Sequence, residues 1–160
     1  MKHTNGTKIL KAALAVVLCT FAVGCSAAQK TVNTAESLAK GMVDALGDVG
    51  REFTKIGEET YMDVYKLDKS KYEDVMVYGS PVNEKAHEMI VIKAKDAANL
   101  EEAKKDLEAR KAALEEQWKD KLPEQYELVQ KAVIRTKDNY AALIIAPDVQ
   151  KAQEAFDKSF

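Results

Sequence analysis

The spacing of hydrophobic residues differs between two parts of the chain, one with a helical pattern and one in which strand-like and helical segments alternate. Between residues 34 and 67, apolar side chains recur every three or four positions, which is typical of amphipathic helices. One such stripe consists of Leu38, Met42, Val43 and Leu46. The pattern predicts a first helix that Asn33 or Thr34 can cap and Gly47 can end, followed by a second helix near 58–66.

From residue 73 onward, short apolar segments with a strand-like pattern come in two pairs, each followed by helix. The predicted strands are 74–79, 88–95, 132–136 and 140–146. The predicted helices are 100–121, 124–130 and 149–158. The sequence therefore predicts an α+β fold: a four-stranded antiparallel sheet in ββαββα order at 73–160, with N-terminal helices at 34–67.

All four predicted strands carry apolar residues on both faces, as Met89 and Val91 do opposite Ile90 and Ile92. Such a sheet needs cover on both sides. We expect the long helix and the C-terminal helix to cover one face and the N-terminal helices to cover the other. The alternative is that one face stays partly open and docks a partner or an apolar ligand.

The first 24 residues have the pattern of an export signal. Lys2, Lys8 and Lys11 precede an uncharged apolar run of 12 residues, 12–23, and no acidic residue lies among them. A transmembrane helix needs roughly 20 residues, so the run is too short for a permanent span. We expect residues 1–24 to be removed as a signal peptide.

The end of the apolar run resembles the lipobox of bacterial lipoproteins, in which small residues precede a cysteine. Here the residues are Phe21, Ala22, Val23, Gly24 and Cys25. Lipid such as palmitate would be attached at Cys25, and cleavage between Gly24 and Cys25 would make the cysteine the first mature residue. Residues 25–32 would then be the lipidated cysteine and a short tether. The alternative is ordinary secretion, with cleavage after Ala27 or Ala28.

Charge and cysteine content narrow the classes of function. Removal of residues 1–24 takes away three lysines and no acid, which changes the net charge from -2 to -5. An acidic chain neutralises phosphates poorly, so we expect no nucleic-acid partner. Cys19 would leave with the signal peptide and Cys25 would carry lipid. No disulfide is therefore expected in the mature domain, which must be stabilised by packing.

The mature chain shows no pattern of catalytic residues. His87 is its single histidine, which argues against sites that need several imidazole or thiolate ligands. We predict no catalytic residue, no metal and no cofactor, and we expect His87 at a solvated strand end. The alternative is a cell-envelope hydrolase that uses carboxylates or a metal near His87. Neighbouring residues of a strand point to opposite faces, so His87 and Glu88 would not converge.

Arg110 is the candidate contact for a ligand or an anion. It interrupts the apolar stripe of the long helix, where a guanidinium usually lies at the edge with its stem packed. The alternative is an anion or carboxylate receptor, to which Arg135 on the third predicted strand could contribute. Trp118 and Tyr126 are expected to pack in and around the core.

Several short motifs follow one another in a recognisable order. After the lipobox and the N-terminal helices they are 77–80, 88–96, Arg110, 122–123 with Tyr126, and 136–146. This order resembles a family of bacterial lipoproteins known only as a domain of unknown function, the one numbered four-three-five-eight. The resemblance covers roughly residues 60–160. It implies a Gram-positive, surface-anchored α+β domain without assigned catalytic residues.

Together these features predict a lipoprotein held by Cys25 on the extracytoplasmic side of the cell membrane. Residues 33–160 would form one domain that acts as a non-catalytic binding or interaction module. Its partner would be an envelope protein or a small ligand. A weaker alternative is an accessory subunit of a transporter or an envelope enzyme.

Overall fold

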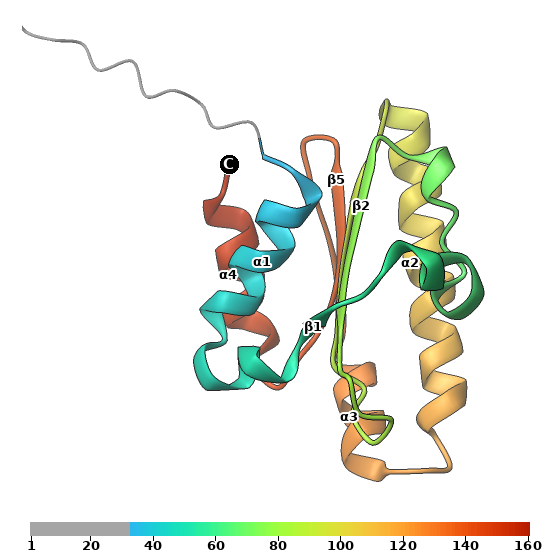
Figure 1. Ribbon diagram of the computed structural model, residues 1–160, viewed down its shortest axis with the longest axis vertical. Helices are drawn as coiled ribbons and strands as arrows, with labels where there is room; N and C mark the ends of the chain where they lie inside the picture. The colour runs from blue at the N-terminus through green and yellow to red at the C-terminus, as the bar shows by residue number, and fades with distance from the viewer. Residues whose placement is uncertain (1–32) are drawn as a thin grey trace, which may run out of the picture. The chain divides into compact units, whose positions relative to one another are not determined.

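The computed structural model describes residues 33–160, so the expected signal peptide, Cys25 and tether lie outside the described part of the chain. Five strands form one antiparallel sheet in the order β1-β2-β3-β5-β4 (Figure 1). The strands are β1 (Thr54–Lys55), β2 (Asp74–Gly79), β3 (Glu88–Lys93), β4 (Val133–Lys137) and β5 (Tyr140–Ile145). The central strands β3 and β5 pair over their full length, from Glu88 opposite Ile145 to Lys93 opposite Tyr140.

The prediction of an antiparallel sheet is confirmed, but the predicted number of four strands is wrong. The additional strand, β1, has only two residues, and it pairs with the end of β2 by placing Thr54 opposite Gly79. Both β1 residues are exposed. A strand of this length has no measurable hydrophobic alternation, so only its register against β2 reveals it.

Within residues 33–160, four α-helices accompany the sheet. They are α1 (Ala35–Ala45), α2 (Ala97–Trp118), α3 (Pro123–Gln130) and α4 (Val149–Lys158). Of the two candidate caps for α1, Thr34 accepts a hydrogen bond from the Ser37 N–H, which satisfies a free donor of the first turn. Asp96 and Asp148 cap α2 and α4 in the same way. These local signals were readable in the sequence.

The helix predicted near 58–66 is not a regular α-helix. The chain forms a 3-10 turn at Glu58–Thr60 and a single π-helical turn at Tyr61–Tyr65. Lys66 then adopts a left-handed conformation, with φ of 56°, which ends the helical path. Tyr61 and Tyr65 are nonetheless buried, so the apolar positions were identified correctly although their conformation was not.

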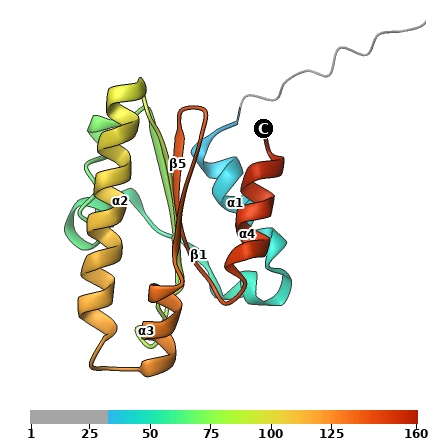
Figure 2. The same ribbon diagram turned by 180° about the vertical axis from the view of Figure 1, so that it is seen from behind.

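Both faces of the sheet are covered, as expected, but the C-terminal helix α4 lies with α1 and not with the long helix α2. α1 and α4 lie side by side on one face, whereas α2 and α3 lie on the other (Figures 1 and 2). The chain crosses between the two layers through β1, so Tyr61 and Tyr65 join the core under α2 rather than the core under α1. Because every central strand is apolar on both sides, the pattern could not say which helix covers which face.

The two layers enclose two separate cores. Ile90, Ile92 and Leu143 face α2, while Met89 and Ile144 face α1 and α4. All five of these side chains are fully buried. The sheet therefore has no open apolar face in the described residues, and the alternative of a partner docked directly on the sheet does not hold for this domain.

Candidate functional site

Arg110 and Glu88 form a buried ion pair between α2 and the first residue of β3. The Arg110 Nε donates to Glu88 Oε1 at 2.8 Å, and Nη2 donates to Oε2 at 2.6 Å. The Nη1 of the same guanidinium donates to the carbonyl oxygen of Val64 at 3.0 Å. Three segments distant in the sequence are thus joined through one side chain. Arg110 lies at the inner edge of the helix stripe and is paired, as the simplest interpretation of its position expected.

The ion pair shifts the protonation equilibria of its members. Burial raises the pKa of the Glu88 carboxyl, and the hydrogen bonds from Arg110 oppose that shift. Burial disfavours the charged guanidinium, but the Glu88 carboxylate outweighs burial and raises the pKa of Arg110. The bidentate geometry requires a carboxylate facing a guanidinium, so we treat both groups as charged at neutral pH.

Tyr65 covers the other side of the guanidinium. The Arg110 Cζ lies 4.6 Å from the centroid of the Tyr65 ring, a cation–π contact. Burial raises the pKa of the Tyr65 hydroxyl to about 12. The ring fits because residue 79 is glycine: a Cβ at Gly79 would lie 2.7 Å from the Tyr65 hydroxyl oxygen. The sequence pattern placed Gly79 only at the end of a predicted strand and gave no sign of this packing role.

A pocket of about 410 Å³ opens beside the ion pair, between the loop 80–87 and the C-terminal end of α2. We call it the Trp118 pocket. Residues that matter to its chemistry are Val64, Val82, Lys85, Arg110, Trp118 and Lys121. The loop is attached to α3, since the Ala86 N–H donates to Gln125 Oε1 at 2.9 Å.

Two buried nitrogens at this pocket lack hydrogen-bond partners. In the described part of the chain, the buried side-chain polar atoms without a partner are Trp118 Nε1 and His87 Nδ1. Both residues line the Trp118 pocket. Trp118 is buried, as expected of a core residue, and Tyr126 packs against the same core partly exposed. Buried polar groups are normally satisfied, so unpaired ones at a pocket are candidate ligand contacts.

His87 is not at a solvated strand end: its residue exposure is only 6%. Its ring stacks on Phe53, with the ring centroids 5.4 Å apart. Its Nδ1 lies 3.2 Å from Glu52 Oε2 without the alignment of a hydrogen bond. Burial lowers the pKa of His87, opposed by the charge of Glu52. As predicted, His87 and Glu88 diverge, because Phe53 belongs to the α1 layer and Arg110 to the α2 layer.

Arg135 does not join Arg110. Its Nε and Nη2 donate to the two carboxylate oxygens of Asp157, both at 2.9 Å, so β4 is linked to α4 in the other layer. The structure therefore does not bring the two arginines into one anion site. Two cations that the sequence did not single out, Lys85 and Lys121, lie at the Trp118 pocket instead. They come from a loop and from a helix end, where spacing along the chain carries no sign of proximity.

Two kinds of structural feature are absent from residues 33–160. No three His, Cys, Asp or Glu side chains are grouped there in a way that could hold a metal ion. None of the helices in this range combines the length and apolar character needed to cross a bilayer.

Comparison with known proteins gives a family and no described function. No curated protein and no solved structure matches the chain. The matching family model covers residues 46–146, which contain β1 to β5, the ion pair and the Trp118 pocket. This span begins and ends earlier than the resemblance to 60–160 indicated. Since the match covers more than half of the sequence, the chain belongs to the family described as "Domain of unknown function (DUF4358)".

Proposed function

We propose that this chain is a bacterial lipoprotein of Gram-positive type, anchored through Cys25, whose extracytoplasmic domain is a non-catalytic binding module. The observation that carries the binding role is the Trp118 pocket. Its volume of about 410 Å³ lies within the roughly 300–1,000 Å³ typical of small-molecule sites. The unpartnered indole nitrogen of Trp118 and the cationic side chains of the pocket are groups that a ligand could satisfy.

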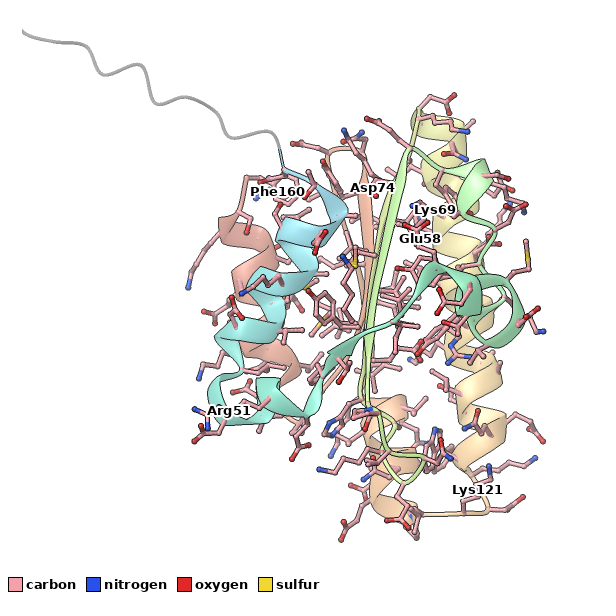
Figure 3. All side chains as sticks on the ribbon, viewed as in Figure 1. Arg51, Glu58, Lys69, Asp74, Lys121 and Phe160 are labelled. Atoms are coloured by element: carbon pink, nitrogen blue, oxygen red, sulfur yellow. The ribbon has the colours of Figure 1, made fainter. Side chains whose placement is uncertain are left out.

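The position of the pocket in the domain supports the combination of anchor and binding site. Asn33 is attached to the C-terminal end of the domain, since its Nδ2 donates to the Ser159 carbonyl oxygen at 2.7 Å. Lys121 lies at the opposite end from Phe160 (Figure 3). Asn33, where the described chain begins, and Lys121 of the Trp118 pocket therefore lie at opposite ends of the described domain. Seven extended residues between Cys25 and Asn33 span at most roughly 25 Å, which keeps the domain near the membrane.

The anchor is tested by metabolic labelling of the full chain with an alkyne-bearing palmitate analogue, followed by membrane fractionation. We expect the unmodified chain to be labelled and to sediment with membranes. Cys25→Ala should lose the label and leave the membrane fraction. Cys19→Ala, which changes the other cysteine of the chain, is the matched control and should behave like the unmodified chain. Equal labelling of the Cys25→Ala form would rule out the proposed anchor.

The second candidate function is a cell-envelope hydrolase centred on His87. The specific observation in its favour is the Glu52 carboxylate 3.2 Å from His87 Nδ1, at a residue that lines the pocket. A histidine oriented by a carboxylate can act as a general base. Hydrolysis of cell-wall or phospholipid substrates by the full chain, abolished by His87→Gln, would favour this function over the binding module. Equal rates in both forms would exclude a role for His87.

A further inference from the structure

The charges around the Trp118 pocket leave one cation without a partner. Arg110 is neutralised by Glu88, and Lys85 Nζ lies 2.6 Å from Glu52 Oε2. Lys121 has no ion-pair partner within residues 33–160, and its Nζ lies 5.8 Å from the centroid of the Trp118 ring. The net charge of the side chains at the Trp118 pocket is therefore one positive charge, which a ligand with one negative charge would match.

The unpartnered indole of Trp118 narrows the chemistry further. An indole N–H can only donate, so the missing partner must be an acceptor. A charged oxygen accepts more strongly than a neutral one. Because Lys121 Nζ lies close to the same ring, one carboxylate could accept from Trp118 Nε1 through one oxygen and from Lys121 through the other.

The end of α2 acts against an anion but does not outweigh Lys121. Trp118 is the last residue of α2, and the free carbonyls of a helix C-terminus carry about half a negative charge. The ammonium of Lys121, in the turn that follows this helix end, carries a full positive charge. A doubly charged anion would add repulsion from the helix end to an uncompensated charge, so the pocket favours a monoanion.

Apolar side chains at the rim indicate that the ligand is not a bare inorganic ion. Val64 and Val82 are 54% and 49% exposed, unusually high for valine, and both line the pocket. Leu114, which is buried, lines it as well. A short apolar group beside the carboxylate would cover these side chains and remove them from water.

We propose that the Trp118 pocket binds organic acids with a single carboxylate and a short apolar group, and that the carboxylate contacts the Trp118 indole N–H and the Lys121 ammonium. The proposal rests on the binding role proposed above and names its ligand class. A free acid and the C-terminal carboxylate of a peptide share this chemistry.

Trp118 provides the measurement, because it is the only tryptophan of the chain and its emission reports on this pocket alone. The full-length lipoprotein in dodecyl maltoside is titrated with 4-methylpentanoate as a free acid and with N-acetyl-alanyl-leucine as a peptide acid. The corresponding amides are the uncharged controls, and inorganic phosphate is the doubly charged one when all titrations are done at a mildly alkaline pH, where its dianion dominates. We expect saturable emission changes with at least one acid and none with the amides or phosphate.

Lysine variants separate a specific site from a general charge effect. Lys121→Ala should weaken acid binding about tenfold, the low end for a charged hydrogen bond in an exposed setting. Lys121→Arg keeps the charge and should recover most of the affinity. Lys105→Ala removes an exposed lysine from α2, outside the pocket, and should leave binding unchanged.

The outcomes distinguish this proposal from the one it rests on. Equal binding of the amides or of phosphate, or acid binding that is insensitive to Lys121→Ala, overturns the carboxylate assignment while the binding role survives. If no probe changes the emission, the carboxylate assignment also fails. Loss of palmitate labelling is independent of all these results, because it concerns Cys25 only.

Discussion

Arg110 holds both carboxylate oxygens of Glu88, at 2.8 and 2.6 Å, and thereby ties the middle of α2 to the start of β3. Side-chain exposures of 11% and 6% place the pair inside the domain. In this setting, loss of one partner leaves the other charge buried and unpaired. The pair is therefore a point at which the α2 layer is sensitive to single changes.

Replacement of one member of this pair should be strongly destabilising. We expect Arg110→Met to lower the free energy of unfolding by about 3–5 kcal/mol, because the Glu88 carboxylate stays buried without its partner. The double variant Arg110→Met with Glu88→Leu should recover much of that loss. Urea unfolding of the full-length Cys25→Ala chain measures both.

Arg135 supplies the control for the buried pair. Its partner Asp157 is also bound through two oxygens, but the Arg135 side chain is 44% exposed. Arg135→Met should therefore cost less than about 1 kcal/mol. A loss as large as that of Arg110→Met would show that burial is not what makes the Glu88 pair sensitive.

Gly79 should not tolerate a side chain while Tyr65 is present. The Cβ of Gly79→Ala would lie 2.7 Å from the Tyr65 hydroxyl oxygen, and we expect a loss of about 1–3 kcal/mol from overpacking. Tyr65→Phe removes that oxygen, so the double variant should be more stable than Gly79→Ala alone. Thermal and urea unfolding of the three variants test the coupling.

The matched glycine is Gly41 in α1, where a Cβ would meet nothing within 4 Å. Gly41→Ala should stabilise the domain by roughly 0.5–1 kcal/mol, since alanine favours a helix interior. Destabilisation by both alanine substitutions would mean that the Tyr65 contact is not the cause at residue 79.

Stability should depend on the protonation of His87. Burial holds the pKa of folded His87 below its ordinary value of 6.5, so the unfolded chain binds the proton more readily. The contribution of neutral His87 to the free energy of unfolding is therefore fully present above pH 6.5. It is lost as the pH falls toward the pKa of His87 in the folded chain. When the pH falls from 7.5 to 5.5, the free energy of unfolding should decrease less in His87→Gln than in the unmodified chain. The difference should be at most about 1.4 kcal/mol per pH unit. Identical pH profiles would contradict this assignment.

The left-handed residue after the π-helical turn offers a stabilising substitution. Lys66 is exposed and has a φ of 56°, a conformation that glycine adopts without steric cost. Lys66→Gly should raise the free energy of unfolding by about 0.5–1 kcal/mol. Lys105→Gly, in the interior of α2, should instead lower it by about 1 kcal/mol. Opposite signs in urea unfolding are the expected result.

Much of the fold was predictable because its elements depend on local signals. The C-terminal helix lies at Val149–Lys158, as predicted, because its apolar stripe follows Pro147 and the cap Asp148. The turn at Asp138 was also predictable, and Asp138 has the positive φ of 51° that such turns need. The hydrogen bonds of helix caps and tight turns join residues within four positions of each other. Their residues therefore stand close together in the sequence and can be identified from it.

The candidate site was only partly predictable. Arg110 stood out because a charge interrupts an apolar stripe, and a charged residue at the head of an apolar strand could have identified Glu88 as its partner. Nothing in the pattern indicated that Tyr65 and Gly79 share space. Lys121 and Trp118 were readable as single residues, but their relation to the loop 80–87 was not.

The sequence by itself determined most of the helices and strands, where most of them begin, and that both faces of the sheet need cover. Tertiary structure decided which helix covers which face, added β1, and assembled the Trp118 pocket from a turn, a loop and a helix end. The physical reason is the distance along the sequence over which each interaction acts. Periodicity and capping act over a few residues, whereas layer assignment and pocket formation depend on contacts such as Arg110 with Val64, 46 positions apart.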